Sequence, residues 1–279
     1  MIQDSQTNFL YLAGTLPDFY VTFYRAFEKL LNKHNISFEL LPETKDVWAV
    51  DYMPIQIDRN RFVQFVYKPS YFKKKELVFR SDVDVICDQI KLERTKSPIL
   101  LDGGNVVRTE TKAIMTDRIY TENPTIEPKQ LQKELKETLE LEDLFIIPQY
   151  PNDFTGHADG LVRFLDDQTV LVNSFTESET AYQEIFEKSI RGYGLELIRI
   201  PYNPFTEINK SEKHANGLYI NYLQMDGIII IPTFGLKEDD IAIKQFEGLF
   251  PEHTITYLNC NEIADGGGVL NCITWNILK

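Results

Sequence analysis

Residues 157–161 have the sequence HADGL, and residues 214–218 repeat it as HANGL, 57 residues further along the chain. Each copy follows a helical pattern and a short apolar segment, and each opens a further apolar segment. Before the first copy these are LQKELKETLELED (131–143) and LFIIP (144–148); before the second they are YQEIFEKSIRGYG (182–194) and LELIRIP (195–201). The match in residues and in element order predicts a repeated supersecondary unit.

Three further segments follow the same order of elements. The first is FYRAFEKLLNKHN, ISFELLP and VWAVDYMPIQI (23–57), and its apolar residues at three- and four-residue spacing predict a helix followed by strands. The last is IAIKQFEGLF, TITYL and GGGVLNCITWNI (241–277). A less regular unit spans VDVICDQIKLE, PILLDGGNVV and AIMTDRI (83–119), and the hairpin turn DDQ (166–168) leads into the strand-like TVLVNS of the HADGL unit.

One polar position recurs in every unit. These positions are separated by 51, 57, 57 and 50 residues, and they are Asp51, Asp102, Asp159, Asn216 and Gly266. Five α/β units at a nearly constant period predict a ring or an array in a single domain spanning residues 1–279. In a closed ring the five positions would meet at the centre. The loop YNPFTEINKSEK (202–213), rich in turn-forming residues, is expected to border that centre.

Composition limits the classes of protein. The chain has 279 residues, 43% hydrophobic and 25% charged, which is typical of a soluble globular protein. Its formal net charge of −13 argues against a nucleic-acid or anionic-membrane partner and weakly favours a cationic ligand. Three cysteines give no disulfide framework, and neither a signal peptide nor a membrane-length apolar run is found, so a cytoplasmic protein is expected.

The C-terminal segment GGGVLNCITW (266–275) contains a candidate nucleophile. Three glycines let a ligand approach the backbone, and Cys272 follows where the last strand is expected to begin. A thiol becomes a strong nucleophile where its thiolate is favoured. A cysteine in an apolar strand is also commonly a small buried hydrophobe. This segment by itself does not exclude that alternative for Cys272.

The segment TGHADGLVRF (155–164) offers a histidine and a carboxylate. On a strand, His157 and Asp159 would point to the same face. A histidine can donate a proton to a leaving amine and then activate water, and a carboxylate beside it can hold a cation. The alternative is a turn histidine with a capping aspartate.

Two more aspartates are candidates. Asp51 lies in the apolar, strand-like VWAVDYMPIQI, where a buried carboxylate needs a partner such as a ligand guanidinium or an arginine of the chain. Asp102 in ILLDGGNVV could orient the histidine or form a turn.

Four motifs together resemble a known family. WAVDYMP (48–54), LDGGN (101–105), GHAD (156–159) and GGGVLNCIT (266–274) are similar, in the same order, to segments of agmatine deiminases and bacterial peptidylarginine deiminases. The resemblance extends from about residue 45 to the end of the chain. It implies the pentein fold, a five-bladed α/β propeller of ββαβ-type units with pseudo-fivefold symmetry and an active site on the axis.

The resemblance also implies roles for individual residues. Cys272 corresponds to the nucleophile, His157 to the general acid/base and Asp102 to the carboxylate that supports the histidine. Substrate binding is assigned to Asp51 and Asp159, which would clamp the guanidinium, and to other residues of the same motifs: Trp48, Gly267 and Asn271.

The implied activity is hydrolysis of the guanidinium group of a small cationic substrate, such as agmatine or an arginine derivative. The products would be ammonia and a ureido compound, formed through a covalent thiouronium intermediate. No metal and no organic cofactor are expected. The implied partner is the small-molecule substrate, and a homo-oligomer is compatible with the sequence.

The chain also departs from the family pattern. Val50 and Met53 stand where the family usually has arginine and glycine, Asp102 replaces a glutamate, and Asn271 replaces a histidine. The chain is also shorter than typical agmatine deiminases. The proposed reaction chemistry is compatible with these departures, but they leave open whether agmatine is the substrate.

Three alternatives remain at this stage: an amidinotransferase, a non-catalytic pentein resembling the ribosome anti-association factors, and a metal site formed by His157, Asp159 and His214. For the far end of a substrate, Arg163 is a candidate partner of a carboxylate.

Overall fold

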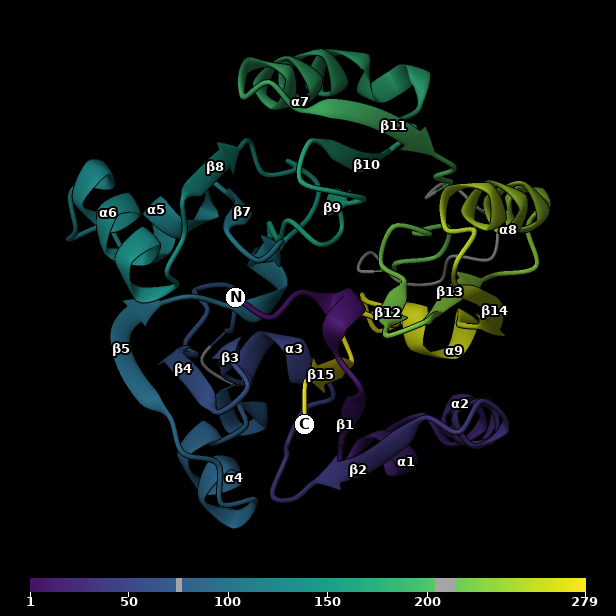
Figure 1. Ribbon diagram of the computed structural model, residues 1–279, viewed down its shortest axis with the longest axis horizontal. Coiled ribbons are helices and arrows are strands. Elements are labelled where there is room, and N and C mark those ends of the chain that lie inside the picture. The colour runs from purple at the N-terminus through teal and green to yellow at the C-terminus, as the bar shows by residue number, and fades with distance from the viewer. Residues whose placement is uncertain (74–76, 204–213) are drawn as a thin grey trace.

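The computed structural model describes residues 1–73, 77–203 and 214–279. Within these ranges the strands form five three-stranded sheets. The sheets surround a common centre, and the long helices lie outside them, as Figure 1 shows. The predicted α/β class and the five successive units are therefore confirmed.

The five sheets have the same strand arrangement. In each, a middle strand pairs with one antiparallel and one parallel edge strand. The antiparallel edge strands are β15 (Thr274–Ile277), β3 (Ile55–Asp58), β6 (Val107–Arg108), β9 (Val162–Phe164) and β12 (Leu223–Met225). The middle strands are β1 (Phe9–Ala13), β4 (Arg61–Val66), β7 (Lys112–Thr116), β10 (Thr169–Asn173) and β13 (Ile228–Thr233). The parallel edge strands are β2 (Ser37–Leu41), β5 (Thr95–Leu100), β8 (Asp143–Ile147), β11 (Glu196–Ile200) and β14 (Thr254–Asn259).

A helix connects each middle strand to its parallel edge strand, as a parallel pairing requires. These connecting helices are α2 (Val21–Lys33), α4 (Val83–Gln89), α6 (Pro128–Thr138), α7 (Thr180–Gly192) and α8 (Lys237–Leu249). Shorter helices are α1 (Leu16–Phe19), α3 (Ala49–Tyr52), α5 (Arg118–Glu122) and α9 (Asn261–Ala264). Four 3₁₀ turns complete the described elements: η1 (Asp4–Gln6), η2 (Leu77–Phe79), η3 (Gly103–Asn105) and η4 (Glu177–Glu179).

Side-chain patterns explain these elements. In α2, Phe23, Phe27 and Leu31 recur at four-residue spacing and are all buried, so one face of the helix packs on the core. Every residue of β13 is buried, and its run of four isoleucines suits a middle strand covered on both faces. At α4 the Asp82 carboxylate accepts hydrogen bonds from the amides of Asp84 and Val85 and so caps the first turn.

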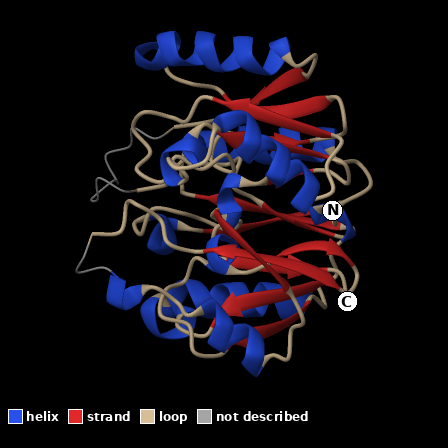
Figure 2. Ribbon diagram, turned by 90° about the vertical axis from the view of Figure 1, so that its left-hand side faces the viewer, coloured by secondary structure: helices blue, strands red, loops and turns tan. Residues whose placement is uncertain are grey.

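The two ends of the chain close the ring. β15 pairs antiparallel with β1, with Leu10 opposite Asn276 and Leu12 opposite Thr274. The first sheet therefore combines the N-terminal and C-terminal strands, and both termini lie on the same side of the molecule (Figure 2). Because Cys272 precedes β15 by two residues, this pairing also fixes the position of its sulfur.

Three local expectations were wrong. Asp51 belongs to the short helix α3, Asp159 and Cys272 lie in turns, and His157 lies in the irregular segment just before the Asp159 turn, so none of them is on a strand. The physical reason is common to them. The chain leaves the parallel edge strand of one sheet there and enters the antiparallel edge strand of the next, so it must change direction. Of the loop expected to border the centre, residues 204–213 lie outside the described residues.

We expect Trp275→Ala to destabilise the ring closure. Trp275 is 5% exposed, its ring lies 5.2 Å from that of Tyr11, and its indole N–H donates to the Pro54 carbonyl at 2.9 Å. Removing a buried tryptophan costs about 3–5 kcal/mol of unfolding free energy. Urea unfolding measures this loss. Tyr257→Ala is the control, because Tyr257 is 58% exposed on β14 and its removal should change stability by less than about 0.5 kcal/mol. Equal stabilities of the two variants would contradict a role of Trp275 in stabilising the closure.

Candidate active site

The connections that enter the antiparallel edge strands line a central cavity of about 330 Å³, the size of a small-molecule site. Four of the five recurring polar positions line it directly: Asp51, Asp159, Asn216 and Gly266. The fifth, Asp102, lies behind His157 and contacts it. The convergence that the repeat predicted is therefore found in the structure.

His157 is held between two carboxylates. Its Nε2 lies 3.1 Å from Oδ2 of Asp102, and its Nδ1 lies 3.4 Å from Oδ1 of Asp51. All three side chains are buried. The shorter Asp102 side chain therefore still reaches the histidine, although the family pattern has glutamate there.

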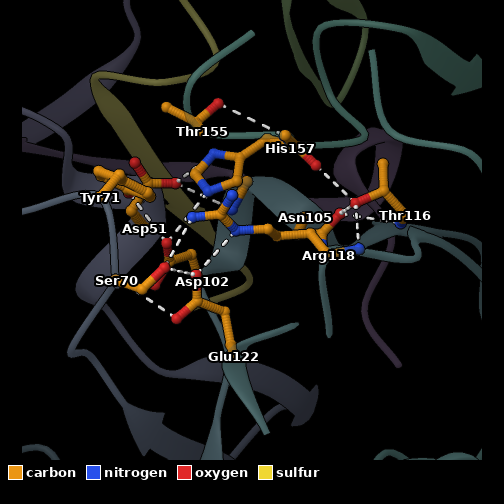
Figure 3. A network of polar contacts seen from close by, with 12 residues as sticks. Asp51, Ser70, Tyr71, Asp102, Asn105, Thr116, Arg118, Glu122, Thr155 and His157 are labelled. Atoms are coloured by element: carbon orange, nitrogen blue, oxygen red, sulfur yellow. Dashed lines mark hydrogen bonds and ion pairs between the residues drawn. The ribbon is translucent and has the colours of Figure 1, made fainter. Parts of the chain in front are cut away.

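Polar contacts fix the Asp102 carboxylate in turn, as Figure 3 shows. The Tyr71 hydroxyl donates to Oδ2 of Asp102 at 2.9 Å. The guanidinium of Arg118 lies 5.6 Å from the centre of the Tyr71 ring, and Arg118 is itself paired with Glu122 at 2.7 Å. Tyr71 was not predicted from the sequence, because a single tyrosine in an irregular segment gives no pattern.

The two carboxylates set the charge of the histidine. Burial by itself would lower the pKa of His157, but the neighbouring Asp51 carboxylate and the hydrogen bond to Asp102 raise this pKa to about 10. His157 is therefore an imidazolium at neutral pH and can act as a proton donor. Burial, together with the nearby Asp102 and Asp159 carboxylates, raises the pKa of Asp51 well above its usual value, although the imidazolium opposes this effect.

Asp159 is fixed by two asparagine amides. Its Oδ2 accepts from Nδ2 of Asn271 at 2.7 Å and from Nδ2 of Asn221 at 3.0 Å. The amide N–H of Cys272 donates to Oδ1 of Asn221 at 3.2 Å, which orients that asparagine. Burial raises the pKa of Asp159, while His157 and the two amides lower it. Asn221 was missed in the sequence, because no repeated motif contains it.

The Cys272 sulfur lies 3.6 Å from Oδ2 of Asp159. The thiol is only partly buried, whereas Cys87 and Cys260 are fully buried. Burial raises the pKa of Cys272 well above its usual value, and the Asp159 and Asp51 carboxylates raise it further. A cation placed between these carboxylates would remove their repulsion and favour the thiolate.

Close packing at the site requires glycine at position 104. A Cβ there would lie 2.5 Å from Oδ1 of Asp51 and 2.8 Å from Nδ1 of His157. The Gly104 amide instead donates to Asp51 at 3.1 Å, and its carbonyl accepts from the Asp159 amide at 3.0 Å. This glycine of the second unit therefore links the first and third units at the centre of the ring.

The other predicted residues divide into two groups. Trp48 and Gly267 line the cavity, and Gly267 has a positive φ of 105°. Asn271 does not line it; its amide lies behind Asp159. Arg163 is also outside the cavity wall and is buried behind the site, so the expectation that it meets a substrate carboxylate is wrong.

The metal alternative receives no support. Within residues 1–73, 77–203 and 214–279, no group of three or more His, Cys, Asp or Glu side chains is arranged to hold a metal ion.

The same part of the chain contains no helix long and apolar enough to span a membrane.

The arrangement can bind a planar cation and attack it. No described residue donates a hydrogen bond to Oδ2 of Asp51 or to Oδ1 of Asp159, so one oxygen of each carboxylate is available to a ligand. A sulfur nucleophile and a proton donor flank the same space. These side chains lie on connections between five small sheets arranged around one cavity, and this arrangement defines an α/β protein of the pentein class.

The chain belongs to the Porphyromonas-type peptidyl-arginine deiminase family, whose sequence pattern matches residues 20–277. Two similar proteins carry the name "Putative agmatine deiminase". The Mycoplasma mycoides protein is 23% identical, over 82% of this chain and 74% of its own length. The Vibrio parahaemolyticus protein is 25% identical, over 69% of this chain and 62% of its own length. Agmatine deiminase from C. jejuni has a similar structure, with a TM-score of 0.80 at 20% identity, over 100% of this chain and 95% of that one.

The raised pKa of Cys272 predicts its reactivity. Because the thiolate is the reactive form, the rate of alkylation by iodoacetamide should still be rising above the ordinary cysteine pKa of about 8.5. Mass spectrometry of the native protein identifies the labelled residue. The fully buried Cys87 and Cys260 are internal controls and should stay unlabelled. A rate that reaches its plateau below about pH 8 would contradict the assigned environment.

Proposed function

We propose that the chain is a cysteine-dependent deiminase that hydrolyses the guanidinium group of a small cationic molecule. The observation that carries the proposal is the placement of the Cys272 sulfur 3.6 Å from Asp159, in one cavity with His157 between Asp51 and Asp102. Membership of the deiminase family supports it.

Asp51 and Asp159 bind the guanidinium as a clamp. Each offers an oxygen that no described residue occupies, and a planar guanidinium matches two carboxylates through parallel N–H bonds. The aromatic ring of Trp48 borders the same cavity and can cover the face of the cation. Asn271 acts through Asp159 rather than on the substrate.

The proposed substrates are agmatine or a small arginine derivative. Besides Asp51 and Asp159, the carboxylates of Asp46 and Asp153 line the cavity, and the described lining residues include no lysine or arginine. A cavity with acidic side chains and aromatic walls favours a ligand with a positive charge and an aliphatic linker. It disfavours a free carboxylate.

The reaction follows from the charges. Binding of the cation neutralises the carboxylates that keep Cys272 protonated, so the thiol loses its proton to solvent and the thiolate attacks the central carbon. The His157 imidazolium gives its proton to one amino group, the C–N bond breaks, and ammonia leaves a covalent thiouronium. Neutral His157 then takes a proton from water. The resulting hydroxide adds to the same carbon, and the C–S bond breaks. The O–H proton of this intermediate passes to solvent as the ureido C=O forms, and the product leaves while the thiolate re-forms.

We also propose a domain organisation, a propeller architecture and a cellular compartment for this chain. Residues 1–279 form one catalytic domain, the five sheets are the blades of an α/β propeller with pseudo-fivefold symmetry, and the site lies on its axis. The family resemblance and the repeated ββαβ order support this assignment. A cytoplasmic enzyme is consistent with an accessible thiol.

We expect Cys272→Ser to reduce ammonia release from guanidino compounds by at least about a thousandfold, because the serine hydroxyl is not activated at this site. The assay contains no acceptor amine. Ammonia release by the unaltered protein under these conditions identifies a hydrolase, whereas turnover only with an added amine identifies an amidinotransferase. Activity retained by the serine variant would remove Cys272 from the mechanism.

Asp159→Asn is expected to weaken binding of the cation. Losing a charged hydrogen-bond partner costs about 1.5–3 kcal/mol, so KM should rise by about tenfold to a hundredfold. The matched control is Asp167→Asn, since Asp167 is exposed in the hairpin between β9 and β10. If both variants keep the KM of the parent, Asp159 is not part of the clamp.

A further inference from the structure

Arg163 is a buried cation that the proposed reaction does not use. It lies on β9 and is 4% exposed, on the side of Asp159 away from the cavity. Its Nη1 donates to Oδ1 of Asn271 and to the carbonyl of Tyr222, both at 3.0 Å. Its Nη2 donates to Oδ2 of Asp4 at 2.6 Å, and its guanidinium lies 4.5 Å from the centre of the Tyr222 ring.

The contact with Arg163 determines which end of the Asn271 amide faces Asp159. An arginine can only donate, so it selects the amide oxygen. The amide nitrogen must then point the other way, where it donates to Oδ2 of Asp159 at 2.7 Å. Without Arg163 the amide could rotate and present its oxygen to the carboxylate, which would be repulsive.

Arg163 also balances the charge of Asp159. The charged or titratable groups that face this carboxylate are His157 from the same connection, Asp51 from α3, Cys272 from the turn before β15 and Arg163 from β9. Among them only His157 and Arg163 are cationic. Burial raises the pKa of Asp159, and Arg163 is one of the groups that lower it.

The anchor at the other end of Arg163 is Asp4, in the 3₁₀ turn η1. Asp4 is also paired with Arg108, whose Nη2 lies 3.3 Å from Oδ1 of Asp4. Arg108 donates to the Ile2 carbonyl at 2.8 Å and belongs to β6. Asp4 is therefore paired with two arginines, Arg108 and Arg163. Of these two, only Arg163 is connected to Asp159 through Asn271.

We propose that Arg163 is a positioning residue that fixes the Asn271 amide and thereby holds Asp159 ready to bind the guanidinium. This role rests on the proposed function. It gives the N-terminal turn a part in substrate binding through the chain of contacts Asp4, Arg163, Asn271 and Asp159.

The test compares Arg163→Met with the control Arg108→Met. Asp159 holds the cation in the ground state and the transition state alike, so the Arg163 variant should raise KM for agmatine about tenfold or more and change kcat much less. Arg108→Met should leave KM unchanged. A KM of the Arg163 variant equal to that of the control would overturn the role.

The pH dependence of KM separates positioning from a general loss of structure. The carboxylate must be ionised to bind a cation, so KM rises as the pH falls through the pKa of Asp159. Losing Arg163 raises this pKa, so the increase in KM should begin at a higher pH than in the parent protein. A merely structural role would leave the position of this increase unchanged.

A double-mutant cycle with Asn271→Ala tests the route. If Arg163 acts through Asn271, most of its effect on KM is already lost in the Asn271 variant, so the two effects are not additive. Full additivity would overturn the proposed path. Should Arg163→Met fail to fold, Arg163→Lys replaces it. Lysine keeps the positive charge but not the planar guanidinium, so KM should still rise, while the pH at which KM begins to increase should move less than in Arg163→Met.

Calorimetric binding of agmatine to proteins carrying Cys272→Ser distinguishes this inference from the proposed function. If the parent Cys272→Ser protein binds no agmatine or other guanidino compound, the proposed function fails and this role fails with it. If it binds agmatine and the added Arg163→Met change has no effect at any pH, only the role of Arg163 fails. Weaker binding on adding Arg163→Met, but not on adding Arg108→Met, supports both.

Discussion

The site depends on an imbalance of buried charge. Three aspartates, Asp51, Asp102 and Asp159, are buried at the centre of the ring, and His157 is the only cation in direct contact with two of them within the described residues. Excess negative charge away from water is costly unless it finds a partner. A cationic ligand relieves this cost. The same imbalance raises the pKa of the Cys272 thiol, so in the proposed mechanism binding of the cation also favours the thiolate.

The ring explains how such a cluster can be built. Each unit contributes the connection that enters its antiparallel edge strand, and these connections meet at the centre. Glycine at position 104 allows two of them to approach closely, and pairing of β15 with β1 brings the C-terminal cysteine to the same place. Ring closure is therefore a condition for assembling the candidate site.

The structure shows how the replacement residue is accommodated at two of the positions that depart from the family pattern. Asp102 is shorter than glutamate, yet it reaches His157 and is held by the Tyr71 hydroxyl. Asn271 stands where the family has histidine, and its uncharged amide bridges Arg163 and Asp159. No contact within the described residues explains why Val50 and Met53 replace arginine and glycine.

The sequence by itself determined the α/β class, the five units and the set of residues that meet, because hydrophobic periodicity and the HADGL/HANGL repeat are local and readable along the chain. It did not determine the conformation of Asp51, His157 and Cys272, since an apolar segment with one polar residue fits a strand as well as a helix or a turn. Tyr71, Asn221 and the buried position of Arg163 were decided only by the tertiary structure. Their partners lie 31 to 159 residues away, and no local pattern records such contacts.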